Sequence, residues 1–152
     1  MVRDSQAVKK ARILVVDDDP MMRALPRHVL QSAGYVVDVA PDGASAFQMA
    51  RRSDYDLVIT DLDMPGLDGF GLLSLVRSQT NAEAIVMTGP RSGDLSSVKR
   101  AFDLGAVGYV AKTGEFTEDL ITSVRQALAV RRSRLARQRS GPTAADTGTH
   151  VS

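Results

Sequence analysis

The stretch ILVVDDDP (residues 13–20) places four apolar residues directly before three consecutive aspartates. An apolar run of this kind, rich in β-branched residues, is typical of a strand that is buried on both faces of a sheet. Negative charges crowded at the end of a buried strand repel one another and need compensation nearby. The stretch therefore predicts a core strand with a charged site at its carboxyl end.

Five β-rich runs alternate with segments of helical spacing along the chain. Met22, Leu25 and Val29 show the helical pattern after the first run, and Phe116 and Leu120 begin a longer one after the last. This alternation predicts an α/β fold, a doubly wound five-stranded parallel sheet with helices on both faces. The five runs are RILVV (12–16), VVDV (36–39), LVIT (57–60), AIVM (84–87) and VGYVA (107–111).

Length and composition fit one domain with flexible ends. The chain has 152 residues, of which 43% are hydrophobic, and it has no cysteine, which excludes disulfides and thiolate metal sites. No apolar run approaches the ~20 residues of a membrane span, and no signal peptide is recognisable, so we expect a cytoplasmic protein. The predicted divisions are a flexible segment (1–11), the domain (12–128), a basic helical extension (129–139) and a disordered tail (140–152).

The charge of the chain is unevenly distributed although its net value is only +1. Residues 125–139 hold six arginines and no acid, whereas residues 1–124 carry 13 basic and 17 acidic side chains, a balance of −4. An acidic body argues against nucleic-acid binding. The basic extension is interpreted as a solvated helix end or as a linker towards an output domain, with direct DNA binding as a minor alternative.

Polar residues follow four of the predicted strands at their carboxyl ends. In a parallel sheet these ends share one edge, where ligands bind at the point at which the chain order reverses. The carboxylates suit Mg²⁺, and an opposing lysine and hydroxyl could hold phosphoryl oxygens, so the set predicts a phosphoryl-transfer site. The residues are Asp17, Asp18, Asp61, Asp63, Thr88 and Lys112.

Four motifs, in this order, resemble the receiver domains of two-component response regulators over about residues 12–128. They are VVDD, ITDLDMPGLDG, MTG and GYVAK. The resemblance implies a flavodoxin-like receiver fold and a signalling switch that turns over no external substrate. It also implies that Asp61 accepts a phosphoryl group from the phosphohistidine of a histidine kinase or a histidine phosphotransfer protein, in a Mg²⁺-dependent reaction.

The resemblance assigns the metal ligands residue by residue. Asp18 would bind Mg²⁺ directly and Asp17 mainly through water. Asp61 and the backbone carbonyl of Asp63 would complete the protein's share of the coordination.

The resemblance also assigns a switch. Thr88 would donate its hydroxyl to the phosphoryl group, Lys112 would form an ion pair with it, and Tyr109, in the run GYVAK, would be the switch aromatic. The output would be a population shift on the face formed by the fourth helix, the fifth strand and the fifth helix. A homodimer through this face and an output domain beyond the basic helix are open alternatives.

Three residues depart from the family pattern. Thr113 stands where proline usually follows the lysine, so we expect a trans peptide bond, which leaves the reach of Lys112 open. Pro26 should kink or delay the first helix, and Pro90 should stiffen the loop after Thr88.

Simpler roles account for the remaining polar residues. Asp19 is predicted to cap a helix that begins at Pro20, and Asp68 to cap the third helix. Neither His28 nor His150 is a credible ligand or base. The run DLDMPG has only a superficial likeness to a calcium loop, because Leu72 replaces the bidentate carboxylate.

Two other functions compete with the phosphoacceptor. The run VITDLDMP resembles the nucleophile strand of haloacid-dehalogenase-type phosphatases, with Asp61 as the nucleophile and Asp63 as the acid, although those enzymes carry the motif on their first strand. The other alternative is a receiver module that acts only by binding partner proteins.

Overall fold

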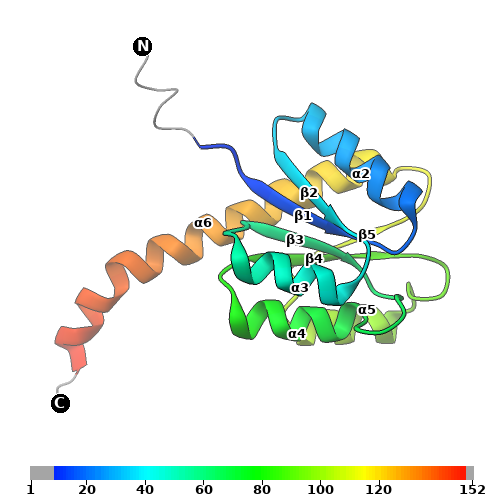
Figure 1. Cartoon of the computed structure of the whole chain (residues 1–152). Coiled ribbons are helices and arrows are strands. Elements are labelled where there is room, and N and C mark those ends of the chain that lie inside the picture. The colour runs from blue at the N-terminus through cyan, green and yellow to red at the C-terminus, as the bar shows by residue number, and fades with distance from the viewer. Residues whose placement is uncertain (1–8, 150–152) are drawn as a thin grey trace, which may run out of the picture.

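The computed structural model describes residues 9–149 and contains one parallel sheet of five strands (Figure 1). The strand order is β2-β1-β3-β4-β5, and each neighbouring pair is parallel. The predicted fold class is confirmed. The strands are β1 (Arg12–Val16), β2 (Val36–Ala40), β3 (Leu57–Asp61), β4 (Glu83–Thr88) and β5 (Tyr109–Ala111).

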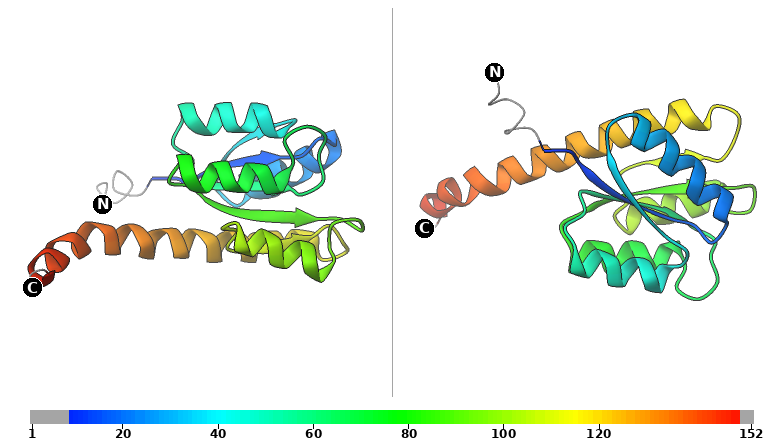
Figure 2. Two further views of the ribbon diagram at one scale, coloured as in Figure 1. Left: turned by 90° about the horizontal axis from the view of Figure 1, so that it is seen from below. Right: turned by 45° about the horizontal axis from the view of Figure 1, so that its top comes forward.

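Helices cover both faces of this sheet (Figure 2). One face packs against α2 and α6, and the other packs against α3, α4 and α5. The two faces alternate along each strand, so Leu14 points to the second set of helices and Ile13 and Val15 to the first. The helices are α2 (Pro20–Ser32), α3 (Gly43–Arg52), α4 (Gly69–Gln79), α5 (Leu95–Asp103) and α6 (Phe116–Thr149).

An aspartate caps the start of each of the four shorter helices. The carboxylate of Asp19 accepts a hydrogen bond from the Met21 amide, and that of Asp68 accepts one from the Gly71 amide, as predicted. Pro26 lies inside α2, but the helix is not delayed, because it already begins at Pro20. The other two caps are Asp42 on α3 and Asp94 on α5.

Two arginines fasten the last helix to the amino-terminal edge of the sheet. Arg131 lies 3.0 Å from the carboxylate of Asp56, which directly precedes β3. The Nε of Arg134 donates to Glu83 at 2.7 Å, and its Nη2 donates to the Asn81 carbonyl at 2.7 Å. The basic extension is therefore anchored where these two side chains lie, and is not simply a solvated helix end.

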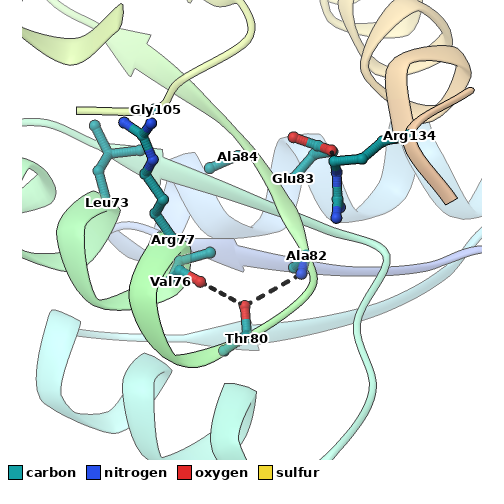
Figure 3. A pocket seen from close by; sticks show the side chains of 9 residues that line it. All are labelled: Leu73, Val76, Arg77, Thr80, Ala82, Glu83, Ala84, Gly105 and Arg134. Atoms are coloured by element: carbon teal, nitrogen blue, oxygen red, sulfur yellow. Dashed lines mark hydrogen bonds and ion pairs between the residues drawn. The ribbon is translucent and has the colours of Figure 1, made fainter. Parts of the chain in front are cut away.

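A small cavity lies beside this anchor (Figure 3). Its volume is about 320 Å³, and Arg134 and Glu83 line it together with residues from the end of α4. The hydroxyl of Thr80 donates to the Val76 carbonyl and accepts from the Ala82 amide, which closes the turn from α4 into β4. The turn therefore holds the start of β4, and with it Glu83, within reach of α6.

The structure differs from the sequence prediction in the tail. The backbone is helical through residues 140–149, where the small, polar composition predicts disorder. Ala144 and Ala145 in the same segment favour a helix. Residues 1–8, most of the predicted flexible segment, and 150–152 lie outside the described residues. In the described part, none of the helices combines the length and apolarity that a membrane crossing requires.

Candidate functional site

The register of the sheet brings the predicted site residues to one edge. Val16 pairs with Thr60, so Asp17 and Asp61 come next on adjacent strands. β4 ends at Thr88, which pairs with Ala111, so Lys112 follows beside it. Because β1 lies between β2 and β3, this edge includes the point at which the chain order reverses, where ligands bind in open α/β sheets.

Lys112 holds the two buried carboxylates of the site together. Its ammonium lies 2.8 Å from Oδ2 of Asp17 and 3.1 Å from Oδ1 of Asp61. The described peptide bonds are all trans, including the bond before Thr113, as predicted. The side chain of Lys112 therefore reaches both carboxylates although the peptide bond before Thr113 is trans.

The environment of Asp61 disfavours its charged form. Burial raises the pKa of this carboxyl group and the charge of Asp17 adds to the rise, while Lys112 opposes it without cancelling it. A hydrogen bond from the Asp63 amide also opposes the rise. Negative charge therefore exceeds positive charge at this site, and a cation or a proton can balance the excess.

Lys112 is correspondingly kept charged. Burial alone would lower its pKa, but the hydrogen bond with Asp17 and the charges of Asp61 and Asp17 outweigh burial and raise the pKa of the ammonium group. A permanent positive charge therefore faces the place where Asp61 would carry a phosphoryl group.

The carboxylates fit a hard divalent cation. One oxygen each from Asp17, Asp18 and Asp61 lies within 4.8 Å of the others, with Asp18 exposed at the mouth and the other two buried. Apart from the ion pair with Lys112, Oδ2 of Asp17 has no hydrogen-bond partner among the described residues. An all-oxygen set that includes two buried carboxylates suits Mg²⁺.

Asp17 is oriented by the residues that follow it. Its Oδ1 accepts from the Asp19 amide at 2.9 Å, and its backbone carbonyl accepts from Arg23 Nη1 at 2.8 Å. Asp19 thus caps α2 with its side chain and positions Asp17 with its backbone. The sequence indicated only the first of these roles, and it indicated nothing about Arg23.

Thr88 is buried at the end of β4, beside a tight loop. The Gly89 amide donates to the Ser92 hydroxyl at 3.1 Å, and the Ser92 amide donates to the Gly89 carbonyl at 3.2 Å. These two bonds close the loop around Pro90, where the sequence predicts stiffness. The backbone of Thr88 also accepts from the Lys112 amide at 2.8 Å, which joins the two site strands.

Asp63 lies beside the cluster and faces solvent. Its carboxylate is 3.8 Å from Nη1 of Arg91, and both side chains are exposed. The ion pair links the loop after β3 with the loop after β4 across the mouth of the site. An exposed pair at this distance contributes little to stability.

Tyr109 is half exposed at the start of β5. Its ring packs edge-on against Phe102 of α5, with 6.3 Å between the ring centroids and 88° between the planes. About half of the side chain is in solvent, so the ring is not a core residue. This position leaves it free to change its packing.

Gly69 packs directly against the backbone of the site. A Cβ at this position would lie 2.3 Å from the Asp61 carbonyl oxygen and 2.6 Å from the Leu62 Cα. The start of α4 therefore supports the loop that follows Asp61. The sequence placed a small residue directly after the cap Asp68, which was the only available signal.

Known proteins share this fold and this sequence pattern. The family model of the response regulator receiver domain matches residues 13–125. The chain belongs to this family. The phosphatase alternative gains no support, because Asp61 ends the third strand of a receiver fold and not the first strand.

Two curated relatives illustrate the match. The transcriptional activator protein IrlR of Burkholderia pseudomallei is 33% identical over 117 residues, which cover 77% of this chain and 50% of IrlR. The transcriptional regulatory protein PdtaR of Mycobacterium tuberculosis is 34% identical over 127 residues, 83% of this chain and 60% of PdtaR. The chain thus spans about half the length of these relatives.

Solved structures of receiver domains superpose on the chain. A putative response regulator from Chloroflexus aurantiacus has a TM-score of 0.72 at 33% identity and covers 80% of this chain and 99% of its own. The signal receiver domain of an HD domain-containing protein from Pseudomonas fluorescens has a TM-score of 0.75 at 28% identity. The match covers 82% of this chain and 99% of that domain.

The packing of Gly69 predicts a destabilised variant. Gly69→Ala should lower the melting temperature by several degrees, because overpacking against backbone costs about 1–3 kcal/mol. Gly114→Ala is the matched control, since a Cβ there meets nothing within 4 Å. Thermal unfolding followed by circular dichroism compares the two, and equal melting temperatures would contradict the packing.

The raised pKa of Asp61 predicts a stability change with a definite pH dependence. Without divalent cations, Asp61→Asn should unfold at a higher temperature than the wild type at pH 7, because the charged carboxylate is less stable in the fold than in the unfolded chain. This cost is complete above the raised pKa and absent below the ordinary value of 3.8. The difference should therefore shrink as the pH falls towards 3.8.

The exposed Asp54 provides the control for this comparison. Asp54→Asn should shift stability by less than about 0.5 kcal/mol at either pH. An Asp61→Asn protein that is less stable than the wild type at pH 7 would mean that the ion pair with Lys112 outweighs burial.

Proposed function

We propose that the chain is the phosphoacceptor module of a two-component phosphorelay, with Asp61 as the residue that receives the phosphoryl group. The observation that carries the proposal is the ammonium of Lys112, which lies within 3.1 Å of Asp61 and of its neighbour Asp17. A fixed cation beside a buried carboxylate is the arrangement that a phosphorylated aspartate requires.

The reaction transfers a phosphoryl group between two side chains. A carboxylate oxygen of Asp61 forms a bond to phosphorus as the phosphorus–nitrogen bond of a partner's phosphohistidine breaks. The electron pair stays on the imidazole nitrogen, which takes up a proton. Because the transition state is loose, the chain contributes mainly position and charge.

The residues around Asp61 have separate roles in this proposal. Asp17, Asp18 and Asp61 would hold Mg²⁺, with the backbone carbonyl of Asp63 as a further ligand. Bound Mg²⁺ would offset the repulsion between the carboxylates and the incoming phosphoryl group. Lys112 would pair with the phosphoryl group after transfer.

Thr88 and Tyr109 form the proposed switch. The hydroxyl of Thr88 would donate to the phosphoryl group, whose added charge and acceptor oxygens bias the loop inward. Tyr109, which is half exposed against Phe102, would then occupy the space that Thr88 leaves. The output would appear on the face formed by α5, β5 and α6.

The partners follow from this chemistry and from the exposed face. The phosphodonor is a histidine kinase or a histidine phosphotransfer protein. The reaction therefore takes place in the cytoplasm, because ATP there supplies the phosphoryl groups. The face of α5, β5 and α6 is a candidate for homodimerisation, and α6 for connection to an output domain. No external substrate is turned over.

Phosphorylation by a small donor tests the proposal. After incubation with acetyl phosphate and Mg²⁺, intact-mass spectrometry should detect one added phosphoryl group on the wild type. The addition should disappear in Asp61→Asn and without Mg²⁺, and it should remain in the control Asp54→Asn. Unchanged labelling of Asp61→Asn would assign the acceptor to another residue, and continuous release of phosphate from a phosphate monoester would favour a phosphatase.

A further inference from the structure

A second polar cleft, of about 820 Å³, opens near the amino-terminal edge of the sheet. It lies between the start of β1, the end of α3 and the anchored part of α6. We call it the basic cleft, because its lining holds six cationic side chains and two carboxylates, Asp54 and Asp56. The cations are Lys9, Lys10, Arg12, Arg51, Arg52 and Arg131.

Internal ion pairs engage some of these cations and leave others available. Arg131 pairs with Asp56 at 3.0 Å, and Arg12 pairs with Asp38 at 3.3 Å. In the part of the chain that the structure describes, the exposed Lys9, Lys10 and Arg52 have no ion pair. The basic cleft therefore presents positive charge that the fold itself does not use.

A second set of cations, which we call the arginine stripe, lies on the exposed surface of α6. Arg125, Arg132 and Arg139 recur every seven residues, so they lie on one face of the helix, about 10.5 Å apart along its axis. All three are exposed. The carboxyl-terminal part of α6 projects beyond the body of the domain (Figures 1 and 2).

The anchoring of α6 fixes the stripe relative to the cleft. Arg131 and Arg134 bind Asp56 and Glu83 at the starts of β3 and β4. Arg132 points about 100° around the helix from Arg131, so the stripe lies to the side of the cleft. Arg131 and Arg134 are thus positioning residues. The exposed arginines beside them remain available to a ligand.

The fold also separates the two signs of charge. The acidic cluster of Asp17, Asp18 and Asp61 lies at the carboxyl ends of the strands, and the basic cleft lies at their amino ends. The sequence argued against nucleic-acid binding from an average over the whole body. The amino-terminal edge of the sheet is basic although the body as a whole is acidic, so this edge can attract a polyanion.

From this geometry we infer that the basic cleft and the arginine stripe together bind the phosphate backbone of a duplex nucleic acid without reading its sequence. A small anion would need only the cleft, whereas the stripe suits an extended polyanion. The extension offers few apolar residues, such as Val130 and Leu135, for insertion into a membrane. Tyr55, the aromatic residue of the cleft, is buried and offers no stacking surface for single strands.

Fluorescence anisotropy of a labelled, mixed-sequence DNA duplex tests the inference with the full chain. Three double variants each remove two positive charges. The cleft variant is Lys10→Gln with Arg52→Gln, and the stripe variant is Arg132→Gln with Arg139→Gln. The control is Arg27→Gln with Lys99→Gln. Each loss of two phosphate contacts should reduce the slope of log K against log salt by about 1.8, at ~0.9 per contact. The control pair is exposed on α2 and α5 and should leave the slope unchanged.

Each other outcome would overturn the inference. Absence of duplex binding at 50 mM salt would show that the cleft does not bind nucleic acid. An equal loss of affinity in the control and in the cleft variant would show the same. Loss of affinity in the cleft variant alone would indicate a site for a small anion, which binding of inorganic phosphate would identify. Tighter binding of single strands than of duplex, or binding only to vesicles with anionic lipid, would assign the surface to a different ligand.

Discussion

The ammonium of Lys112 between Asp17 and Asp61 is the interaction on which the candidate site depends. Two buried carboxylates on adjacent strands repel each other, and Lys112 compensates only part of that charge. The remaining negative charge is what a cation held by Asp17, Asp18 and Asp61 would balance. The negative charge of the site is balanced only when a cation or a proton binds.

The parallel sheet imposes this arrangement and also its counterpart at the opposite edge. All strands run in one direction, so their carboxyl ends gather the aspartates, while their amino ends gather residues at or just before the start of a strand, such as Glu83 and Asp56. Asp56 binds Arg131 and Glu83 binds Arg134, and these contacts hold α6 against the sheet. A chain of nearly zero net charge thereby acquires an acidic edge and a basic edge.

The sequence predicted those features that depend on strand order and strand ends. Four site residues each follow or end an apolar run, namely Asp17, Asp61, Thr88 and Lys112. A parallel sheet brings such positions together independently of the conformation of the loops. Their prediction required no knowledge of side-chain geometry. The same holds for the cap role of Asp19, which depends only on its nearest neighbours in sequence.

Features that depend on contacts between distant segments could not be predicted in this way. The support that Gly69 gives to the Asp61 backbone, and the anchoring of Arg134 by Glu83 across 51 residues, arise only after the elements pack. The reach of Lys112 was left open because Thr113 stands where proline usually follows the lysine. Disorder of the tail was predicted from its small, polar composition, whereas the helical backbone of α6 continues through residues 140–149.

A titration with Mg²⁺ followed by ¹H–¹⁵N NMR tests most directly whether the three aspartates form one cation site. One ion per chain should bind, the saturable shifts should be confined to amides that follow β1, β3 and β5, and Asp18→Asn should weaken the binding at least tenfold. Shifts scattered over the surface, or an unchanged affinity in Asp18→Asn, would show that the aspartates do not act together.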